Sequence, residues 1–142
     1  MFGYLNKILR INLTDQSIKD EKIGDSILKK YIGGQGLGTR ILYDELKPDI
    51  DPLGPENKLI FMTGPLTGIV SSKFEVLAKS PLSKGIGDAN SGGFWGPELK
   101  FAGYDGIIFE GVSPEPVYIT IFDNNVKIES ANVRKAKIWG KP

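Results

Sequence analysis

The first regular pattern along the chain is an alternation of apolar and polar residues. It runs from Ile8 to Leu13, and its period of two residues predicts a strand with one buried face. A short turn follows, and the segment from Ser17 to Ile23 then predicts a more exposed partner strand. The chain is therefore expected to open with a β-hairpin.

A helical period replaces the alternation at about residue 25. Asp25 is expected to cap a first helix, and four apolar residues recur on one face of it: Ile27, Leu28, Tyr31 and Ile32. Gly33 and Gly34 should end this helix, and helical spacing resumes from Gly36 to Leu46. The glycines between the two helices follow a helix and not a strand, which excludes the dinucleotide-binding fingerprint. We expect a helix–helix elbow at which the backbone can approach a ligand or another domain.

The rest of the chain predicts strands, separated by turns and by one short helix. An irregular connection should span residues 47–57, which hold three prolines, and a turn at 123–125 should join the last two strands. The predicted strands are Leu59–Thr63, Lys73–Lys79, Ile107–Glu110, Val117–Phe122 and Val126–Ser130. This order of elements predicts an α+β fold with largely antiparallel β-sheets and two or three short helices.

The stretch from Lys84 to Gly106 stands out because seven of its twenty-three residues are glycine. Such a content favours neither a strand nor a long helix, because each glycine adds backbone freedom that folding must remove. Gly92 and Gly93 precede a predicted short helix, with Pro97 at its first position and Gly103 just past its end. Backbone N–H groups that converge before a helix can bind an anion. A tight, buried turn is the alternative interpretation.

Composition restricts the class of protein. The length of 142 residues fits one domain, and the net charge of +1 without a basic tract argues against nucleic-acid binding. No apolar run approaches the length that spans a membrane, and the first residues lack the apolar core of a signal peptide. We therefore expect a cytoplasmic protein that does not bind a membrane.

Two residue types are missing from the whole sequence. It contains no Cys, and therefore no thiolate nucleophile and no Cys ligand for an iron–sulfur cluster. It contains no His either, which removes the commonest general base and the commonest metal ligand. We expect that this chain by itself is not a complete catalyst and carries no catalytic residue.

The glycine-rich stretch also carries a resemblance to a known family. Residues 87–94 (GDANSGGF) and 96–105 (GPELKFAGYD) resemble the central motif of the N-terminal domain of the tungsten-containing aldehyde ferredoxin oxidoreductases of anaerobes. Four shorter segments match in the same order: GGQGL at 33–37, DPLGPEN at 51–57, TGPLTG at 63–68 and KSPL at 79–82. The similarity extends from Gly3 to Trp139.

The resemblance implies a function for a longer protein. Such an enzyme converts aldehydes to carboxylic acids and passes electrons to ferredoxin. Its tungsten (or molybdenum) is held by two pterins whose phosphates share a magnesium ion. A 4Fe-4S cluster and the acid–base residues lie in helical domains that would follow residue 142. Residues 1–142 then form a single domain, the base on which the bis-pterin cofactor lies, and the resemblance leaves a homo-oligomer open.

Site residues follow from the same resemblance. Asn90 matches the position whose main-chain carbonyl helps to hold the bridging magnesium ion. Ser91, Gly92 and Gly93 match the loop that lies against the pterin and the phosphate, in agreement with the anion site expected from the glycines.

Two positions depart from the family pattern. Lys73 stands where the family typically has an Arg that touches the pterin, and Lys keeps the charge but loses the planar fork of donors. Gln35 stands where many members carry Arg, which weakens a direct role in binding an anion.

Two other hypotheses for the function of the chain stay open. It could be a stand-alone, non-catalytic scaffold or interaction domain of the same fold, or a phosphate or nucleotide binder that uses Gly92 and Gly93. The tail from Arg134 to Pro142 is basic, and its Trp139 is expected to pack on something outside this chain.

Overall fold

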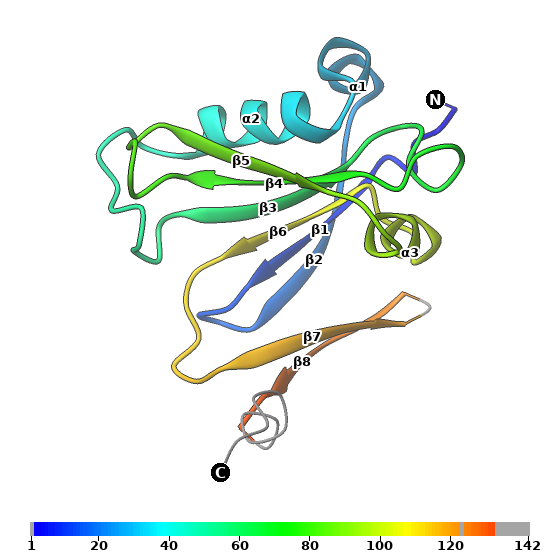
Figure 1. Ribbon diagram of the computed structural model, residues 1–142. Coiled ribbons are helices and arrows are strands. Elements are labelled where there is room, and N and C mark those ends of the chain that lie inside the picture. Colours follow the sequence, from blue (N-terminus) through cyan, green and yellow to red (C-terminus); the bar gives the residue numbers. More distant parts are fainter. Residues whose placement is uncertain (1, 123, 133–142) are drawn as a thin grey trace.

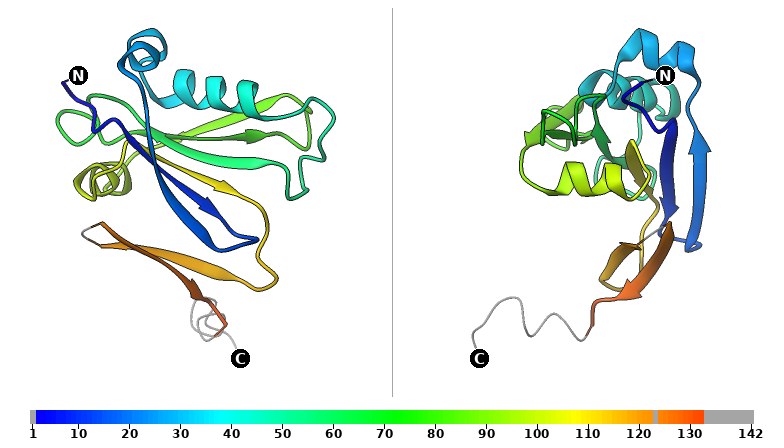
Figure 2. Two further views of the ribbon diagram at one scale, coloured as in Figure 1. Left: turned by 180° about the vertical axis from the view of Figure 1, so that it is seen from behind. Right: turned by 90° about the vertical axis from the view of Figure 1, so that its right-hand side faces the viewer.

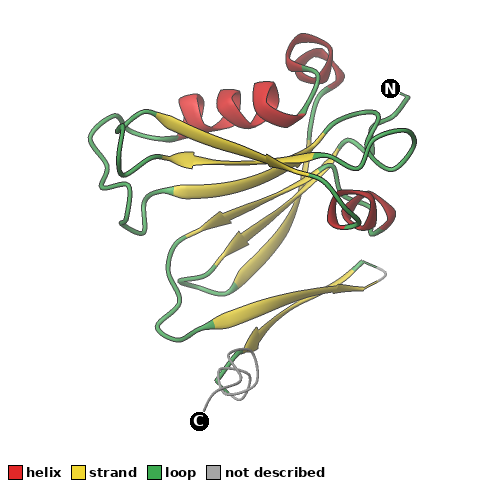
Figure 3. Ribbon diagram, in the orientation of Figure 1, coloured by secondary structure: helices red, strands yellow, loops and turns green. Residues whose placement is uncertain are grey.

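The computed structural model describes residues 2–122 and 124–132 (Figure 1). The tail with Trp139 lies outside the described residues. Figure 3 distinguishes the helices from the strands and the loops. In chain order they are β1 Lys7–Asn12, β2 Ser17–Lys22, α1 Asp25–Tyr31, α2 Gly34–Glu45, β3 Lys58–Thr63, β4 Phe74–Lys79, β5 Ile86–Ser91, α3 Trp95–Phe101, β6 Gly106–Glu110, β7 Val117–Phe122 and β8 Asn125–Ser130.

Six of the strands form one sheet in the order β2-β1-β6-β3-β4-β5. The pair β1–β6 is parallel, and the other neighbours in this sheet are antiparallel. Strands β7 and β8 pair with each other as a separate antiparallel hairpin. The predicted α+β fold with largely antiparallel sheets is confirmed.

Helices α1 and α2 cover one face of the sheet (Figures 1 and 2). Their buried leucines, Leu28, Leu37 and Leu42, join one core with apolar residues of the central strands. Helix α2 lies very close to β4, because a Cβ added at Gly38 would lie 2.5 Å from a methyl carbon of Leu77. Gly38 thus allows α2 to pack closely on β4, and the approach of a ligand or another domain at the glycine elbow stays a prediction.

Helix α3 and the β7–β8 hairpin lie on the opposite face of the sheet (Figure 1). A second core forms there from Leu9, Ile11, Leu99, Tyr104 and Ile107, with partly buried side chains of the hairpin packed against it. The ring of Trp95 lies 4.5 Å from that of Phe74 and 5.1 Å from that of Phe61, measured between centroids. These aromatic contacts fix the start of α3 against β3 and β4.

Three local expectations need correction. The N-cap of α1 is Gly24 and Asp25 is the first helical residue, where its carboxylate accepts a hydrogen bond of 2.7 Å from the Asn6 side chain. Of the four apolar residues predicted for the face of this helix, only Leu28 is buried. Pro97 is the third residue of α3 and not the first, which the helix tolerates because N–H groups of the first turn need no intrahelical acceptor.

The largest correction concerns the glycine-rich stretch, which was not expected to form a strand. Residues Ile86–Ser91 form β5, an edge strand that pairs with β4 over its whole length. The backbone hydrogen bonds offered by the exposed edge of β4 outweigh the poor strand propensity of this segment, because such propensity depends strongly on context. Gly103 does follow the end of α3, with a φ of +96°.

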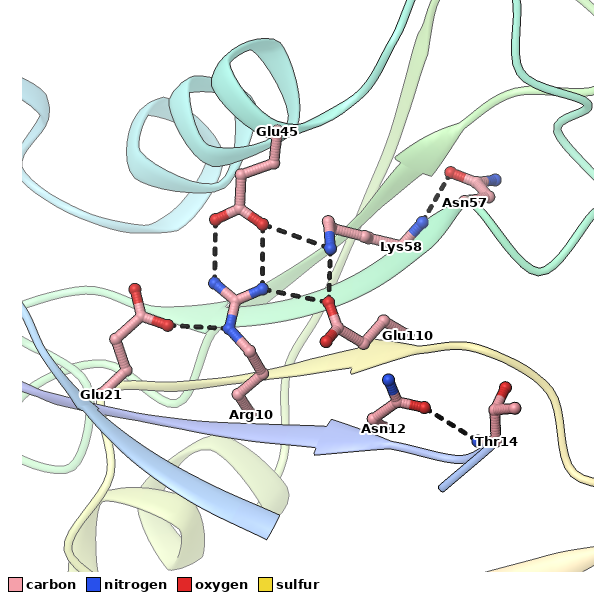
Figure 4. A network of polar contacts seen from close by, with 8 residues as sticks. All are labelled: Arg10, Asn12, Thr14, Glu21, Glu45, Asn57, Lys58 and Glu110. Carbon is pink, nitrogen blue, oxygen red and sulfur yellow. Dashed lines mark hydrogen bonds and ion pairs between the residues drawn. The ribbon is translucent and has the colours of Figure 1, made fainter. Parts of the chain in front are cut away.

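A network of charged side chains joins the end of α2 to the sheet (Figure 4). Arg10 donates to Glu21 at 2.7 Å, to Glu45 at 2.8 Å and to Glu110 at 3.2 Å. Lys58 pairs with Glu45 at 3.3 Å and also with Glu110. Two cations thus share the same pair of half-buried carboxylates.

These contacts set the protonation of the two shared carboxylates. Burial by itself would raise the pKa of Glu45 and of Glu110. Hydrogen bonds and charges from Arg10 and Lys58 outweigh burial and hold each pKa below its ordinary value. Both groups therefore stabilise the fold above the pKa they have in the unfolded chain, and this stabilisation is lost as the pH falls through the folded pKa.

Acid should consequently destabilise the native chain more than a variant without these two carboxylates. We expect the free energy of unfolding of the wild type to fall between about pH 5 and about pH 3, and that of the double variant Glu45→Gln, Glu110→Gln to fall less. Urea unfolding at a series of pH values measures both. Parallel pH profiles for the two proteins would show that the network does not contribute to acid sensitivity.

Candidate cofactor-binding site

The structure brings the five predicted site residues to one end of the sheet. Asn90 and Ser91 end strand β5, Gly92 and Gly93 connect it to α3, and Lys73 directly precedes β4. In the β4–β5 register, Phe74 lies opposite Ser91 and Glu75 opposite Asn90. The side-by-side strands therefore place Lys73 next to the glycine loop although it is distant in sequence.

The loop at Gly92 and Gly93 is exposed, in contrast to the buried turn considered as an alternative. Gly93 has a φ of +107°, and a Cβ added there would meet no atom within 4 Å. Its N–H donates to the Ser72 hydroxyl at 3.3 Å, which fixes the loop to the start of β4. Glycine is thus required at position 93 by the backbone conformation, and the space beside the backbone is open.

Gln35 has a structural contact that sequence alone did not indicate. Its side-chain amide donates to Asp88 at 2.9 Å and so ties the first turn of α2 to β5. A neutral amide at this position is therefore matched to an acidic neighbour on the same chain. This explains the departure from Arg without assigning Gln35 a role in anion binding.

Glu75 is a polar residue near the site that the sequence analysis missed. It lies on β4 opposite Asn90, and a Cβ added at Gly34 would lie 3.4 Å from its Cγ. Its Oε2 atom is buried and has no hydrogen-bond partner among the described residues. Burial raises the pKa of Glu75, the charge of Asp88 raises it further, and the charge of Lys73 opposes the increase. In the sequence, Glu75 is simply the polar residue of an alternating strand.

These residues fit a cofactor that carries both phosphates and a hydrogen-bonding ring. Exposed Lys73 and the open backbone at Gly93 suit a phosphate, and the unpartnered oxygen of Glu75 can accept from an N–H donor. Within residues 2–122 and 124–132, no group of three or more acidic side chains is placed to hold a metal ion. A metal here would depend on main-chain carbonyls and on oxygens of the cofactor itself.

Two cavities lie away from the glycine loop. Their volumes are about 520 Å³ and about 490 Å³, and both lie between the sheet and the β7–β8 hairpin, with Phe61, Phe109 and Ile119 in both linings. Neither contains any of the five predicted site residues. Their walls are mainly apolar, so the polar groups beside the glycine loop define the candidate site. In the described part of the chain, no helix is long and apolar enough to cross a membrane.

The chain matches known oxidoreductases over nearly its whole length. The family "Aldehyde ferredoxin oxidoreductase, N-terminal domain" matches residues 8–142. Proteins named tungsten-containing aldehyde ferredoxin oxidoreductase are 51% identical in Pyrococcus abyssi and 52% identical in Pyrococcus horikoshii, each over 99% of this chain. The chain covers only 23% of the length of these relatives.

A solved structure shares the fold. It is titled the active site complex BamBC of benzoyl coenzyme A reductase, and it matches with a TM-score of 0.91 and 39% identity over 94% of this chain and 21% of that chain. The family match and the shared fold thus place the chain among the N-terminal domains of a class of oxidoreductases. Within that class, the chain belongs to the aldehyde ferredoxin oxidoreductase family.

Proposed function

We propose that residues 1–142 form the base on which a tungsten (or molybdenum) bis-pterin cofactor lies, in an enzyme that converts aldehydes to carboxylic acids and passes electrons to ferredoxin. The observation that carries this proposal is the identity of 51% over 99% of the chain with a relative named for tungsten, aldehyde and ferredoxin. The open, exposed glycine loop beside a lysine supports it from the structure.

The role of this chain in that enzyme is to bind and to orient. The cofactor supplies the redox chemistry when it is bound. Lys73 places a positive charge beside the phosphates, and Ser91, Gly92 and Gly93 offer a backbone surface without obstructing side chains. The main-chain carbonyl of Asn90 would be a ligand of a magnesium ion bound with the cofactor. The 4Fe-4S cluster, the catalytic groups and the contact with ferredoxin belong to other parts of the enzyme.

The choice of substrate is also proposed to lie outside this chain. The solved neighbour is titled for benzoyl coenzyme A and a dienoyl-CoA, whereas the Pyrococcus relatives are named for aldehydes. The same domain fold at 39% identity or more therefore accompanies different substrates. We expect this domain to bind the cofactor in all of these proteins.

The proposal is tested with the full-length enzyme that carries this domain. Purified protein should contain tungsten or molybdenum together with two pterins per chain, measured by metal analysis and by the fluorescence of the released, oxidised pterin. A folded full-length protein without pterin would contradict the proposal and favour a scaffold or interaction domain.

The 142-residue chain by itself should show no aldehyde oxidation with ferredoxin or a viologen dye as electron acceptor. The reason is chemical, since the sequence supplies no Cys to hold a cluster and no His as a general base. Acceptor reduction followed by absorbance, with the full-length enzyme as the positive control, measures this. Reproducible metal-dependent turnover by the isolated chain would reveal a catalytic site within it.

A further inference from the structure

The unpartnered carboxylate of Glu75 needs a physical explanation. A buried polar atom without a hydrogen bond destabilises the fold, and native proteins contain few of them. The Oε2 atom of Glu75 is such an atom, held beneath the first turn of α2 beside Gly34. An orphaned acceptor that persists next to a binding site indicates a partner that arrives with the ligand.

The neighbours of Glu75 do not satisfy it. Asp88 carries the same charge, and one of its oxygens already accepts from Gln35. Lys73 is exposed, its charge acts on Glu75 only at a distance, and it forms no ion pair within 4 Å among the described residues. Asn90 lies opposite on β5, at the end of the strand where the predicted cofactor loop begins. Glu75 thus borders the proposed site and, within residues 2–122 and 124–132, makes no hydrogen bond or ion pair that would hold the fold together.

On the basis of the function proposed above, we propose that Glu75 positions the pterin by accepting hydrogen bonds from its ring. A pterin ring carries a 2-amino group and an adjacent ring N–H on one edge, which are two parallel donors. A carboxylate presents two acceptor oxygens in matching geometry, and hydrogen bonds to an ionised acceptor are the strong ones.

The charged side chains around Glu75 would determine the orientation in which the cofactor binds. Glu75 and Asp88 would repel a phosphate, whereas Lys73 and the open backbone of Gly93 attract it. A cofactor with an anionic end and a donor-bearing end is therefore oriented by the site, with its ring toward β4 and its phosphate toward the loop. Residues on alternating positions of a strand face the same side, which places Lys73 and Glu75 on one surface.

The test compares three variants of the full-length enzyme. Glu75→Gln replaces one acceptor by an NH₂ donor that opposes the donors of the ring, and Glu75→Asp keeps both acceptors on a shorter side chain. Asp88→Asn is the matched control, because it removes the same charge from the same sheet face but leaves Glu75 intact. The pterin retained per chain is measured over time after gel filtration, together with magnesium and tungsten.

We expect Glu75→Gln to lose pterin on the order of tenfold faster than the wild type, which corresponds to one charge-assisted contact. Glu75→Asp should recover part of the retention, and Asp88→Asn should retain pterin nearly as well as the wild type. In the 142-residue chain without cofactor, Glu75→Gln should leave the urea midpoint unchanged or raise it, because it removes the charge from a carboxylate with one buried, unpartnered oxygen.

Several outcomes would overturn this role. Pterin retention by Glu75→Gln equal to the wild type, or equal losses in Glu75→Gln and Asp88→Asn, would show that no specific hydrogen bond is made. Loss of magnesium with the pterin retained would show that Glu75 binds a cation and not the pterin ring. A clear drop in the stability of the chain without cofactor would make Glu75 a structural residue. If the wild-type enzyme itself contains no pterin, the proposed function fails first.

Discussion

Replacing Asp105 with Ala should lower the free energy of unfolding by about 3–5 kcal/mol, the usual effect of removing one member of a buried ion pair. Its carboxylate is almost fully buried and contacts Lys100 at 2.5 Å. The same carboxylate accepts backbone N–H groups of Leu5 at 2.9 Å and Asn6 at 2.7 Å. The substitution therefore leaves a buried ammonium group without its counter-ion and two N–H groups without their acceptor.

Urea unfolding of the 142-residue chain measures this loss, and Asp44→Ala provides the control. Asp44 also forms an ion pair, with Arg40 at 2.6 Å, but both side chains are more than 40% exposed. Such surface pairs contribute about 0–1 kcal/mol. Equal effects of the two substitutions would show that burial does not increase the contribution of Asp105 to the free energy of unfolding.

The buried contact between Asp105 and Lys100 also anchors the helix that follows the candidate site. Lys100 belongs to α3, and its amine also donates to the Gly3 carbonyl at 2.8 Å, so the pair joins the N-terminal segment to this helix. Helix α3 follows the glycine loop directly. The loop is therefore held at its far end by a buried contact, although its own residues are exposed.

The sequence predicted the elements whose pattern is local. The alternation in Ile8–Leu13 predicted β1 because Leu9 and Ile11, two residues apart, enter the same core while polar Arg10 lies between them. Ile8 enters the core on the other face, so this strand is buried on both faces and not on one. The two glycines at 33 and 34 predicted the elbow because a helix has to end there, and Gly34 indeed has a positive φ of +50°. Of the five predicted site residues, Gly92 and Gly93 were indicated by the glycine pattern as well as by the resemblance, whereas Lys73, Asn90 and Ser91 followed from the resemblance alone. The structure places all five at one end of the sheet.

What could not be predicted depends on partners distant in the sequence. Strand β5 forms because β4 offers an edge, which no property of the glycine-rich segment reveals. Arg10 looks like an ordinary exposed strand residue until Glu110, one hundred positions later, is placed beside it. The burial of Glu75 has the same origin, because the first turn of α2 covers it.

Replacing Gly93 with Val in the full-length enzyme should remove most of the bound cofactor while the protein still folds. Because Gly93 has a φ of +107°, a β-branched residue there is strained, at a cost to the fold of about 1–3 kcal/mol. Its added Cβ meets no protein atom within 4 Å, so no further clash arises inside the domain. The new side chain instead fills the open space in which the pterin or phosphate is proposed to meet the backbone.

The expected loss of cofactor exceeds the loss of stability because several contacts are displaced together, each charge-assisted hydrogen bond contributing about 1.5–3 kcal/mol. Bound tungsten per chain and the thermal midpoint are measured for the wild type, Gly93→Val and Gly68→Val. Gly68 is the matched control, since its φ is +86° and an added Cβ would have only ordinary contacts at 3.7 Å or more. Gly68→Val should lower the midpoint by a similar amount and keep its tungsten. Full tungsten content in folded Gly93→Val protein would show that residue 93 is a turn position without a part in binding.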